Sequence, residues 1–295
     1  MEKNQKKALL LGLLAVLLWS TVASAFKLTL RYFEPAQLLL YASLVSFFVL
    51  MSTLVIQKKF FLLFSYSKRD YLFLALLGLI NPFIYYLILF KAYTLLPAQE
   101  AQPLNYTWAL TLSYLSVVIL KHSLGKWDII AGLLCYSGVM IISTHGDVFH
   151  FSFTNLEGVF LALFSTLLWS LYWLYNARLN VDPVVGLCIN FAVALPFIFT
   201  WTFFVSDPFE FNVYGLLGSA YVGIFEMGLT FVLWLNAVKC STNASQIANL
   251  IFISPFISLL LIALIVGETI LFSTFIGLVF IIIGLVVQQK MSKAL

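Results

Sequence analysis

The amino-acid sequence predicts an all-α fold, a polytopic membrane bundle. Hydrophobic residues make up 62% of the 295 residues and charged residues only 9%, and the mean hydropathy is +1.03. A soluble domain carries roughly 25% charged residues. Apolar runs recur at about 20 residues, the length that a helix needs to cross a bilayer. Unpaired backbone groups cost several kcal/mol in hydrocarbon, so these runs must be helices, and the strict alternation of barrel strands is absent.

About ten transmembrane helices are expected, joined by connectors too short to form a soluble domain. They are predicted near Ala8–Phe26, Pro35–Ile56, Tyr71–Tyr93, Ala98–Leu120, Trp127–Thr144, Leu156–Ala177, Val184–Val205, Tyr214–Val238, Asn243–Val266 and Phe272–Gln288. Two spans contain a signal for a break. Pro82 follows Asn81 and removes a hydrogen bond in the middle of the third span, and Pro255 follows Ser254 and predicts a kink in the ninth.

The first span allows two interpretations. Lysines precede it and it ends in Ala23-Ser24-Ala25, which resembles a signal-peptidase site. It could instead be a retained first helix. Trp19-Ser20 in this span has a counterpart at Trp169-Ser170, so cleavage would remove a paired element. We therefore expect the first helix to be retained.

The second half of the chain resembles the first. The matching positions are Gly78 with Gly223, Ala92 with Ala237, Ala98 with Ala244, Gly138 with Gly284, and Trp19-Ser20 with Trp169-Ser170. They predict two repeats of five helices, residues 1–146 and 147–295. Because five is odd, the second repeat enters the membrane from the opposite side, so the repeats are inverted.

Lysine and arginine residues predict the orientation, because cytoplasmic connectors carry an excess of them. With the N-terminus inside, all but three of the 16 basic residues fall on the inner face. The exceptions are Lys27, Arg31 and Lys91. The connectors His145 to Glu157 and Ser206 to Glu210 fall outside and hold no basic residue. We expect a multi-pass protein of the cell membrane with both termini in the cytoplasm.

Several classes of function are disfavoured by what the sequence lacks. The net charge of +4 is spread over short connectors, so no nucleic-acid partner is expected. No GxxxxGK[ST] loop for ATP and no HExxH motif occurs. The histidines and cysteines form no metal-binding pattern and lie in connectors or apolar segments: His122, His145, His150, Cys135, Cys188 and Cys240. We expect neither an enzyme nor a cofactor.

Glu226 is the most prominent candidate for a functional residue, because it lies near the middle of the span Tyr214–Val238. A carboxylate at this depth costs at least a few kcal/mol and is normally functional or paired. On a continuous helix, Gly223, Thr230 and Trp234 would share its face. Apolar surroundings favour the protonated carboxyl group, so Glu226 is a candidate for substrate binding and for proton coupling. The alternative is a structural carboxyl group bonded between helices.

The span Leu156–Ala177 carries a stripe of polar and aromatic side chains at helical spacing, which includes Trp169, Tyr172, Trp173 and Asn176. Rings with polar tips on one face suit the wall of a wet cavity. Trp169 and Tyr172 lie deepest and are candidate substrate-binding residues. The alternative is an aromatic belt at the membrane interface.

The span Ala98–Leu120 is too polar to face lipid on all sides. Asn105, Tyr106 and Trp108 are therefore candidate substrate-binding residues. Glu100 opens the span, and Lys91 at the end of the preceding span is its expected ion-pair partner, with a substrate role as the alternative.

Further candidates lie in the first and third spans. Asn81 and Tyr85 are one helical turn apart, and Trp19 and Ser20 are adjacent. Small residues such as Ser20 also serve close helix packing. Glu268, at the outer end of the ninth span, is expected to be solvated or to cap a helix.

Together these features resemble the drug/metabolite transporter superfamily, in particular its EamA-type branch with ten helices in two inverted repeats. In the second half, the residues that carry the resemblance are Ser245, Ala248, Pro255, Gly267-Glu268, Gly277 and Gly284. In the first half, Ala109 stands where a proline is usual and His122 where glutamate is frequent. The resemblance implies a secondary transporter with a small-molecule substrate in the lipid bilayer, as a monomer or homodimer.

A finer resemblance is to the aromatic amino-acid exporter group. It rests on Leu18-Trp19-Ser20-Thr21 and on Glu100 followed by Asn105-Tyr106-Thr107-Trp108, which lacks the group's proline after Trp108. It implies export of amino acids or similar amphipathic metabolites through a central cavity that opens to one side at a time. A broad-specificity drug exporter, a membrane-embedded enzyme acting on lipid and a scaffold subunit are the competing hypotheses.

Overall fold

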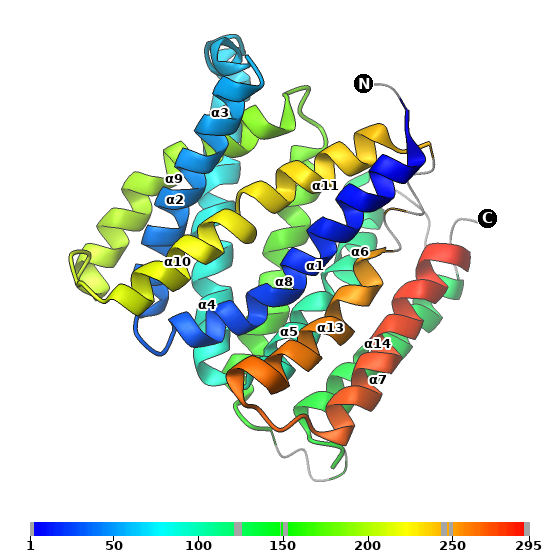
Figure 1. Cartoon of the computed structure of the whole chain (residues 1–295). Coiled ribbons are helices and arrows are strands. Elements are labelled where there is room, and N and C mark those ends of the chain that lie inside the picture. The colour runs from blue at the N-terminus through cyan, green and yellow to red at the C-terminus, as the bar shows by residue number, and fades with distance from the viewer. Residues whose placement is uncertain are drawn as a thin grey trace. The chain divides into compact units, whose positions relative to one another are not determined.

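The computed structural model describes residues 3–120, 126–147, 149, 153–242, 247 and 250–291, and every regular element in them is helical (Figure 1). The elements are α1 (Gln5–Thr29), α2 (Pro35–Ile56), η1 (Phe60–Phe64), α3 (Lys68–Gly78), η2 (Leu79–Ile84), α4 (Tyr85–Leu95), α5 (Ala98–Tyr106), α6 (Trp108–Leu120), α7 (Lys126–Ser143), α8 (Leu156–Asn176), α9 (Pro183–Val205), α10 (Val213–Phe225), α11 (Leu229–Cys240), η3 (Leu250–Ile253), α13 (Ser254–Leu261), η4 (Ile262–Val266) and α14 (Phe272–Met291). The predicted all-α class is confirmed.

Eight helical segments of the described chain are long and apolar enough to cross a membrane. They correspond to eight of the ten expected spans. Of the other two, Ala98–Leu120 is divided into α5 and α6, and the described part of the ninth is the shorter apolar stretch Leu250–Val266. The protein is therefore a multi-pass membrane protein, and the full set of ten spans remains a prediction.

Polar caps and prolines determine where several helices begin. The side chain of Asn155 accepts a hydrogen bond from the amide of Gly158 at the start of α8, and Asn212 accepts from Tyr214 and Gly215 at the start of α10. Pro35 opens α2 and Pro183 opens α9, where a missing N–H costs nothing. These caps satisfy amide groups that have no partner in a first turn.

The helices pack into two units, each described separately. Unit 1 comprises Met1–Leu87 and Leu179–Leu261, and unit 2 comprises Ile88–Arg178 and Ile262–Leu295. Each unit therefore takes helices from both halves of the sequence. The repeat boundary near residue 146 concerns the sequence rather than the packing, and it remains a prediction.

In unit 1, glycines allow α3 to approach α9 and α10 to approach α2. A Cβ atom on Gly78 would lie 2.6 Å from the carbonyl oxygen of Asn190, and one on Gly223 would lie 2.4 Å from that of Ala42. Side chains cannot occupy such positions, so these glycines determine how closely the helices cross.

In unit 2, α7 and α14 pack along each other in the same way. A Cβ atom on Gly138 would lie 2.4 Å from the carbonyl oxygen of Gly277, and one on Gly284 would lie 2.8 Å from that of Ala131. Between these two contacts the thiol of Cys135 donates to the carbonyl oxygen of Ile281 at 3.4 Å. Cys135 is a free, buried cysteine in this helix contact.

Helix breaks interrupt the third, fourth and eighth expected spans. Asn81 has extended backbone angles (φ −138°, ψ 115°) before Pro82, which confirms the break predicted there. Residues 226–228 form a turn between α10 and α11. The predicted continuous face of Glu226 with Thr230 and Trp234 is therefore wrong, because the helix ends at Phe225. Thr107 separates α5 from α6 although no proline follows it.

A salt bridge holds the start of α9 to the segment after α2. The Lys59 Nζ atom lies 2.6 Å from Asp182 Oδ2, and their side chains are 29% and 16% exposed. Burial alone would raise the pKa of Asp182, but the hydrogen bond and charge of Lys59 and the amides of Val184 and Val185 outweigh it, so the pKa is lowered. A carboxylate with a lowered pKa stabilises the fold at neutral pH, and this stabilisation disappears as the pH falls below about 4.

We expect Asp182→Asn to lower the free energy of unfolding by about 1 kcal/mol at pH 7, because a partly exposed ion pair is worth no more. Asparagine keeps the oxygen that caps α9 and loses only the charge. Thermal unfolding in detergent from pH 7 to pH 3 should show the two proteins converging in acid. A difference that stays constant with pH would contradict this role for the charge.

Candidate functional site

Glu226 of unit 1 lies in the turn between α10 and α11 and is 9% exposed. Its Oε1 atom accepts a hydrogen bond of 3.0 Å from the hydroxyl group of Tyr86. Its Oε2 atom is buried and has no hydrogen-bond partner among the described residues. A buried polar atom without a partner costs free energy, so such an atom calls for a functional explanation. Glu226 therefore has one oxygen positioned by the protein and one oxygen available to a proton or a ligand.

Asn81 lies at the other break of unit 1. It is 2% exposed, and its Oδ1 atom also lacks a partner among the described residues. The neighbouring Tyr85 is 3% exposed and stacks edge-on against Tyr86, with ring centroids 4.7 Å apart. Sequence reasoning selected Tyr85 and missed Tyr86. The break at Asn81 shifts the helical phase, so a spacing of four residues from Asn81 no longer identifies the residue that reaches Glu226.

Trp19 and Ser20 of α1 contact α11 and α13 within unit 1. The ring of Trp19 lies 5.6 Å from that of Phe231 and 5.4 Å from that of Trp234. The hydroxyl group of Ser20 lies 3.0 Å from that of Ser254, where α13 begins. This contact fits the packing role considered as the alternative for Ser20, and its substrate-binding role remains a prediction.

In unit 2, the predicted residues of α5, α6 and α8 form polar and aromatic contacts. The Nδ2 atom of Asn105 donates to Ser165 at 2.9 Å, and Ser170 donates to the carbonyl oxygen of Trp108 at 3.0 Å. Trp169 lies 6.2 Å from Tyr172 between ring centroids. Tyr106 is the last residue of α5.

The ten candidate residues are divided equally between the units. Trp19, Ser20, Asn81, Tyr85 and Glu226 lie in unit 1, and Asn105, Tyr106, Trp108, Trp169 and Tyr172 lie in unit 2. Within unit 2, Trp169 and Tyr172 are neighbours, and Asn105 and Trp108 each contact α8. A substrate pocket that both sets share remains a prediction.

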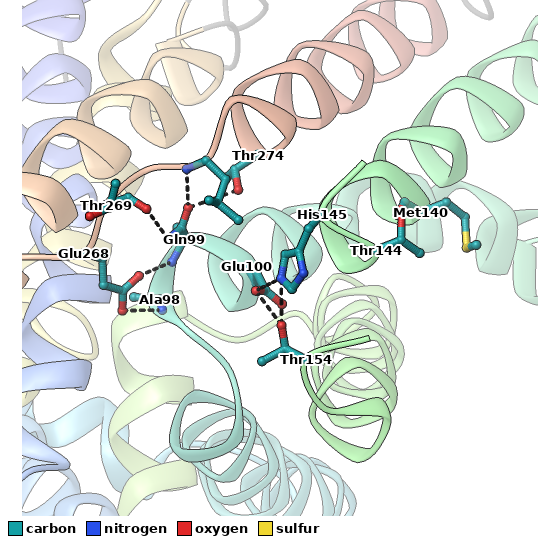
Figure 2. A network of polar contacts seen from close by, with 11 residues as sticks. Ala98, Gln99, Glu100, Met140, Thr144, His145, Thr154, Glu268, Thr269 and Thr274 are labelled. Carbon is teal, nitrogen blue, oxygen red and sulfur yellow. Dashed lines mark hydrogen bonds and ion pairs between the residues drawn. The ribbon is translucent and has the colours of Figure 1, made fainter. Parts of the chain in front are cut away.

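A second buried carboxylate, Glu100, lies in the first turn of α5 in unit 2 (Figure 2). It is 1% exposed, and its Oε1 atom lies 2.9 Å from both His145 Nε2 and Thr154 Oγ1. His145 and Thr154 also contact each other at 2.8 Å. The expected partner Lys91 is exposed and forms no ion pair with Glu100. That expectation is wrong, because the turn after α7 brings a histidine to the carboxylate.

The residues before Glu100 bind the connection into α14. Glu268 accepts hydrogen bonds from the amides of Ala98 and Gln99, so it caps α5, one of the two roles expected for it. The side chain of Gln99 donates to the carbonyl oxygen of Thr269 and accepts from Leu271 and Thr274 (Figure 2). Three consecutive residues of α5 thus hold two connections of unit 2. The sequence did not identify Gln99, because a glutamine by itself indicates no particular structural or functional role.

We expect His145→Asn to lower the free energy of unfolding by about 1.5 kcal/mol, because it removes one of the two hydrogen-bond partners of the buried Glu100 carboxyl group while Thr154 remains. Asparagine tolerates the positive φ of 55° at this position, so the change tests the side chain alone. Lys91→Gln is the matched control and should change the stability by less than about 0.5 kcal/mol. Thermal unfolding in detergent compares them, and equal losses in both variants would contradict the assignment.

Some predicted positions lie outside the described residues: Ser245, Ala248, His122 and His150. Within the described part of the chain, no three His, Cys, Asp or Glu side chains come together that could hold a metal ion.

Comparisons with known proteins agree with the helical membrane architecture. A transporter of Clostridium kluyveri, named "Uncharacterized transporter", is 26% identical over 297 residues, 98% of this chain and 94% of the relative. An "Uncharacterized transporter" of Archaeoglobus fulgidus is 23% identical over 256 residues, 85% of this chain and 86% of the relative. A crystal structure with 19% identity covers 99% of both chains with a TM-score of 0.70, which supports the fold.

The model of the EamA-like transporter family matches residues 6–144 and again residues 156–288. These two matches cover nearly the whole chain and include all ten candidate site residues. The chain belongs to the EamA-like transporter family.

Proposed function

We propose that this protein is a secondary active transporter that exports amino acids, with aromatic amino acids as the first candidates, or similar small amphipathic metabolites. The observation that carries the proposal is the buried carboxyl group of Glu226 at a break in a membrane helix, where one oxygen has no partner in the described part of the chain. Buried ionisable groups at such breaks mark substrate and ion pathways in transporters. Glu226 binds the amino group of the substrate or the coupling proton.

Aromatic and amide side chains complete the proposed site. Within unit 1, the rings of Trp19 and Tyr85 stack on the apolar part of the substrate, and Asn81 binds one of its polar ends. Unit 2 offers side chains of the same kinds in Asn105, Trp108, Trp169 and Tyr172. Stacked rings favour flat apolar groups. The Oδ1 atom of Asn81, which no described residue contacts by a hydrogen bond, accepts one and therefore favours a substrate that donates.

We further propose inverted repeats that alternate access to a central cavity. The double match to the family model supports duplication, and pairs of equivalent contacts support it further. Gly78 meets Asn190 as Gly223 meets Ala42, and Gly138 meets Gly277 as Gly284 meets Ala131. Ser20 contacts Ser254 as Ser170 contacts Trp108. In each pair of contacts, the residue that the first half contributes to one contact is equivalent in sequence to the residue that the second half contributes to the other.

Both termini are proposed to face the cytoplasm of a cell whose plasma membrane holds the protein as a monomer or homodimer. This orientation places the basic connectors inside.

Uptake into proteoliposomes tests the proposal, with a panel of labelled amino acids and structurally unrelated drugs, with and without a pH step. We expect flux above that of protein-free liposomes for amphipathic amino acids. Comparable flux for unrelated drugs would favour a broad-specificity exporter. Absence of all flux would reject transport, with product formation from lipid then indicating an enzyme and a stably copurifying partner indicating a scaffold.

A further inference from the structure

The connection between α2 and α3 lies at a boundary of the membrane. Both α2 and the helical segment Lys68–Leu95 are able to cross the bilayer. The chain between them must therefore lie where water meets lipid. Residues 57–69, which include η1 and the start of α3, are called the α2–α3 segment below.

The α2–α3 segment is held in one conformation against the start of α9. Lys58 has a φ of 56°, which turns the chain out of α2. The amide of Asp182 donates to the hydroxyl group of Tyr66 at 3.1 Å, and Tyr71 donates to the carbonyl oxygen of Leu63 at 2.7 Å. Together with the Lys59–Asp182 salt bridge, these hydrogen bonds fix the α2–α3 segment against the start of α9.

This ordered segment exposes large apolar side chains. The exposed fractions are 81% for Phe61 and 72% for Phe64, with Phe60 and Leu62 at 36% and 37%. The protein fixes the backbone here and leaves the rings uncovered. Apolar side chains such as phenylalanine at a membrane boundary enter the junction of headgroups and acyl chains, where their surface leaves water.

The same surface carries three exposed cations, Lys58, Lys68 and Arg69. None of them forms an ion pair with an acidic residue of the described chain. Lys68 and Arg69 lie in the first turn of α3, where a positive charge opposes the helix dipole. The nearby Asp70 carboxylate is bonded to Ser67 in a capping box. These cations therefore do not stabilise the helix that carries them.

We infer that the α2–α3 segment binds anionic phospholipid: Lys58, Lys68 and Arg69 contact the headgroup phosphates while Phe61 and Phe64 insert beside the acyl chains. Clustered cations next to a membrane helix attract anionic lipid, and adjacent aromatic residues add apolar contact. The Arg69 guanidinium lies 5.7 Å from the ring centre of Phe73, which is 37% exposed and one turn further along α3. The inference does not depend on the transported substrate.

Native mass spectrometry of the full chain in mild detergent tests the inference, by measuring retention of phosphatidylglycerol against phosphatidylcholine. The variant K58Q/K68Q/R69Q leaves Lys59 and its salt bridge intact. Each cation near a lipid surface contributes about a factor of five, so the triple variant should retain phosphatidylglycerol about a hundredfold more weakly. The control K6Q/K91Q/K126Q removes the same charge from three separate exposed positions and should retain phosphatidylglycerol as the wild type does.

Three results would overturn the inference. They are equal retention of the two lipids by the wild type, equal loss in the triple variant and its control, and no decrease in phosphatidylglycerol retention with salt. If the triple variant fails to fold, the salt dependence of phosphatidylglycerol retention by the wild type still tests the inference. Loss of a dimer in F61S/F64S with phosphatidylglycerol retention unchanged would assign the surface to a second copy of the chain instead.

Discussion

Replacing Glu226 with glutamine should remove the response of transport to a pH step. Glutamine has nearly the same shape and can still accept the hydrogen bond that Tyr86 donates at 3.0 Å, but it cannot bind or release a proton. If Glu226 couples proton movement to export, flux driven by a pH step should fall at least about a hundredfold, the lower end of what a positioned acid–base group contributes to proton transfer. Proteoliposome flux with and without the pH step measures the effect.

Two companion variants separate coupling from general damage. Tyr86→Phe removes the hydroxyl group that positions Glu226, and a hydrogen bond to a charged group is worth about 1.5–3 kcal/mol. Flux should therefore fall about tenfold while still responding to pH. Glu157→Gln makes the same chemical change on an exposed carboxylate at the start of α8 and should leave flux unchanged. An E226Q protein that keeps its full pH response would exclude Glu226 as the coupling residue.

The sequence predicted the members of the candidate site better than their partners. Glu226 and Asn81 could be found because polar side chains at mid-membrane depth are costly wherever they point. Tyr86 and His145 could not, because the partner of a buried group depends on tertiary structure. Lys91 was the expected partner of Glu100 by sequence proximity, but the turn after α7 brings His145 to it.

In the fold, too, features determined by the local sequence could be predicted, and features that depend on tertiary packing could not. Hydropathy located the spans, since length and apolar composition alone decide whether a helix can cross the bilayer. The break at Pro82 was predictable because proline removes a backbone donor. The breaks at Thr107 and Glu226 carry no such signal and depend on the helices packed around them. The exchange of helices between the two packing units was not predicted either.

Gly223→Ala should lower the free energy of unfolding by about 3 kcal/mol, because overpacking of a tight helix crossing has costs of this size. The new methyl group would lie 2.4 Å from the carbonyl oxygen of Ala42 and 2.8 Å from the Cβ of Val45. A backbone carbonyl cannot rotate away, so α10 and α2 must separate. Thermal unfolding in detergent should show a lower midpoint, and an unchanged midpoint would contradict the close crossing.

Gly186→Ala is the matched control, and its expected effect has the opposite sign. It makes the same change within α9, where the nearest atom would lie 3.5 Å away, at ordinary contact distance. Alanine is favoured over glycine inside a helix by about 1 kcal/mol, so this variant should be slightly more stable than the wild type. Gly78→Ala, against Asn190, should behave as Gly223→Ala does. If the alanine variants of Gly78 and Gly223 lose stability by similar amounts and Gly186→Ala gains stability, then glycine is required where equivalent helices cross and not throughout the bundle.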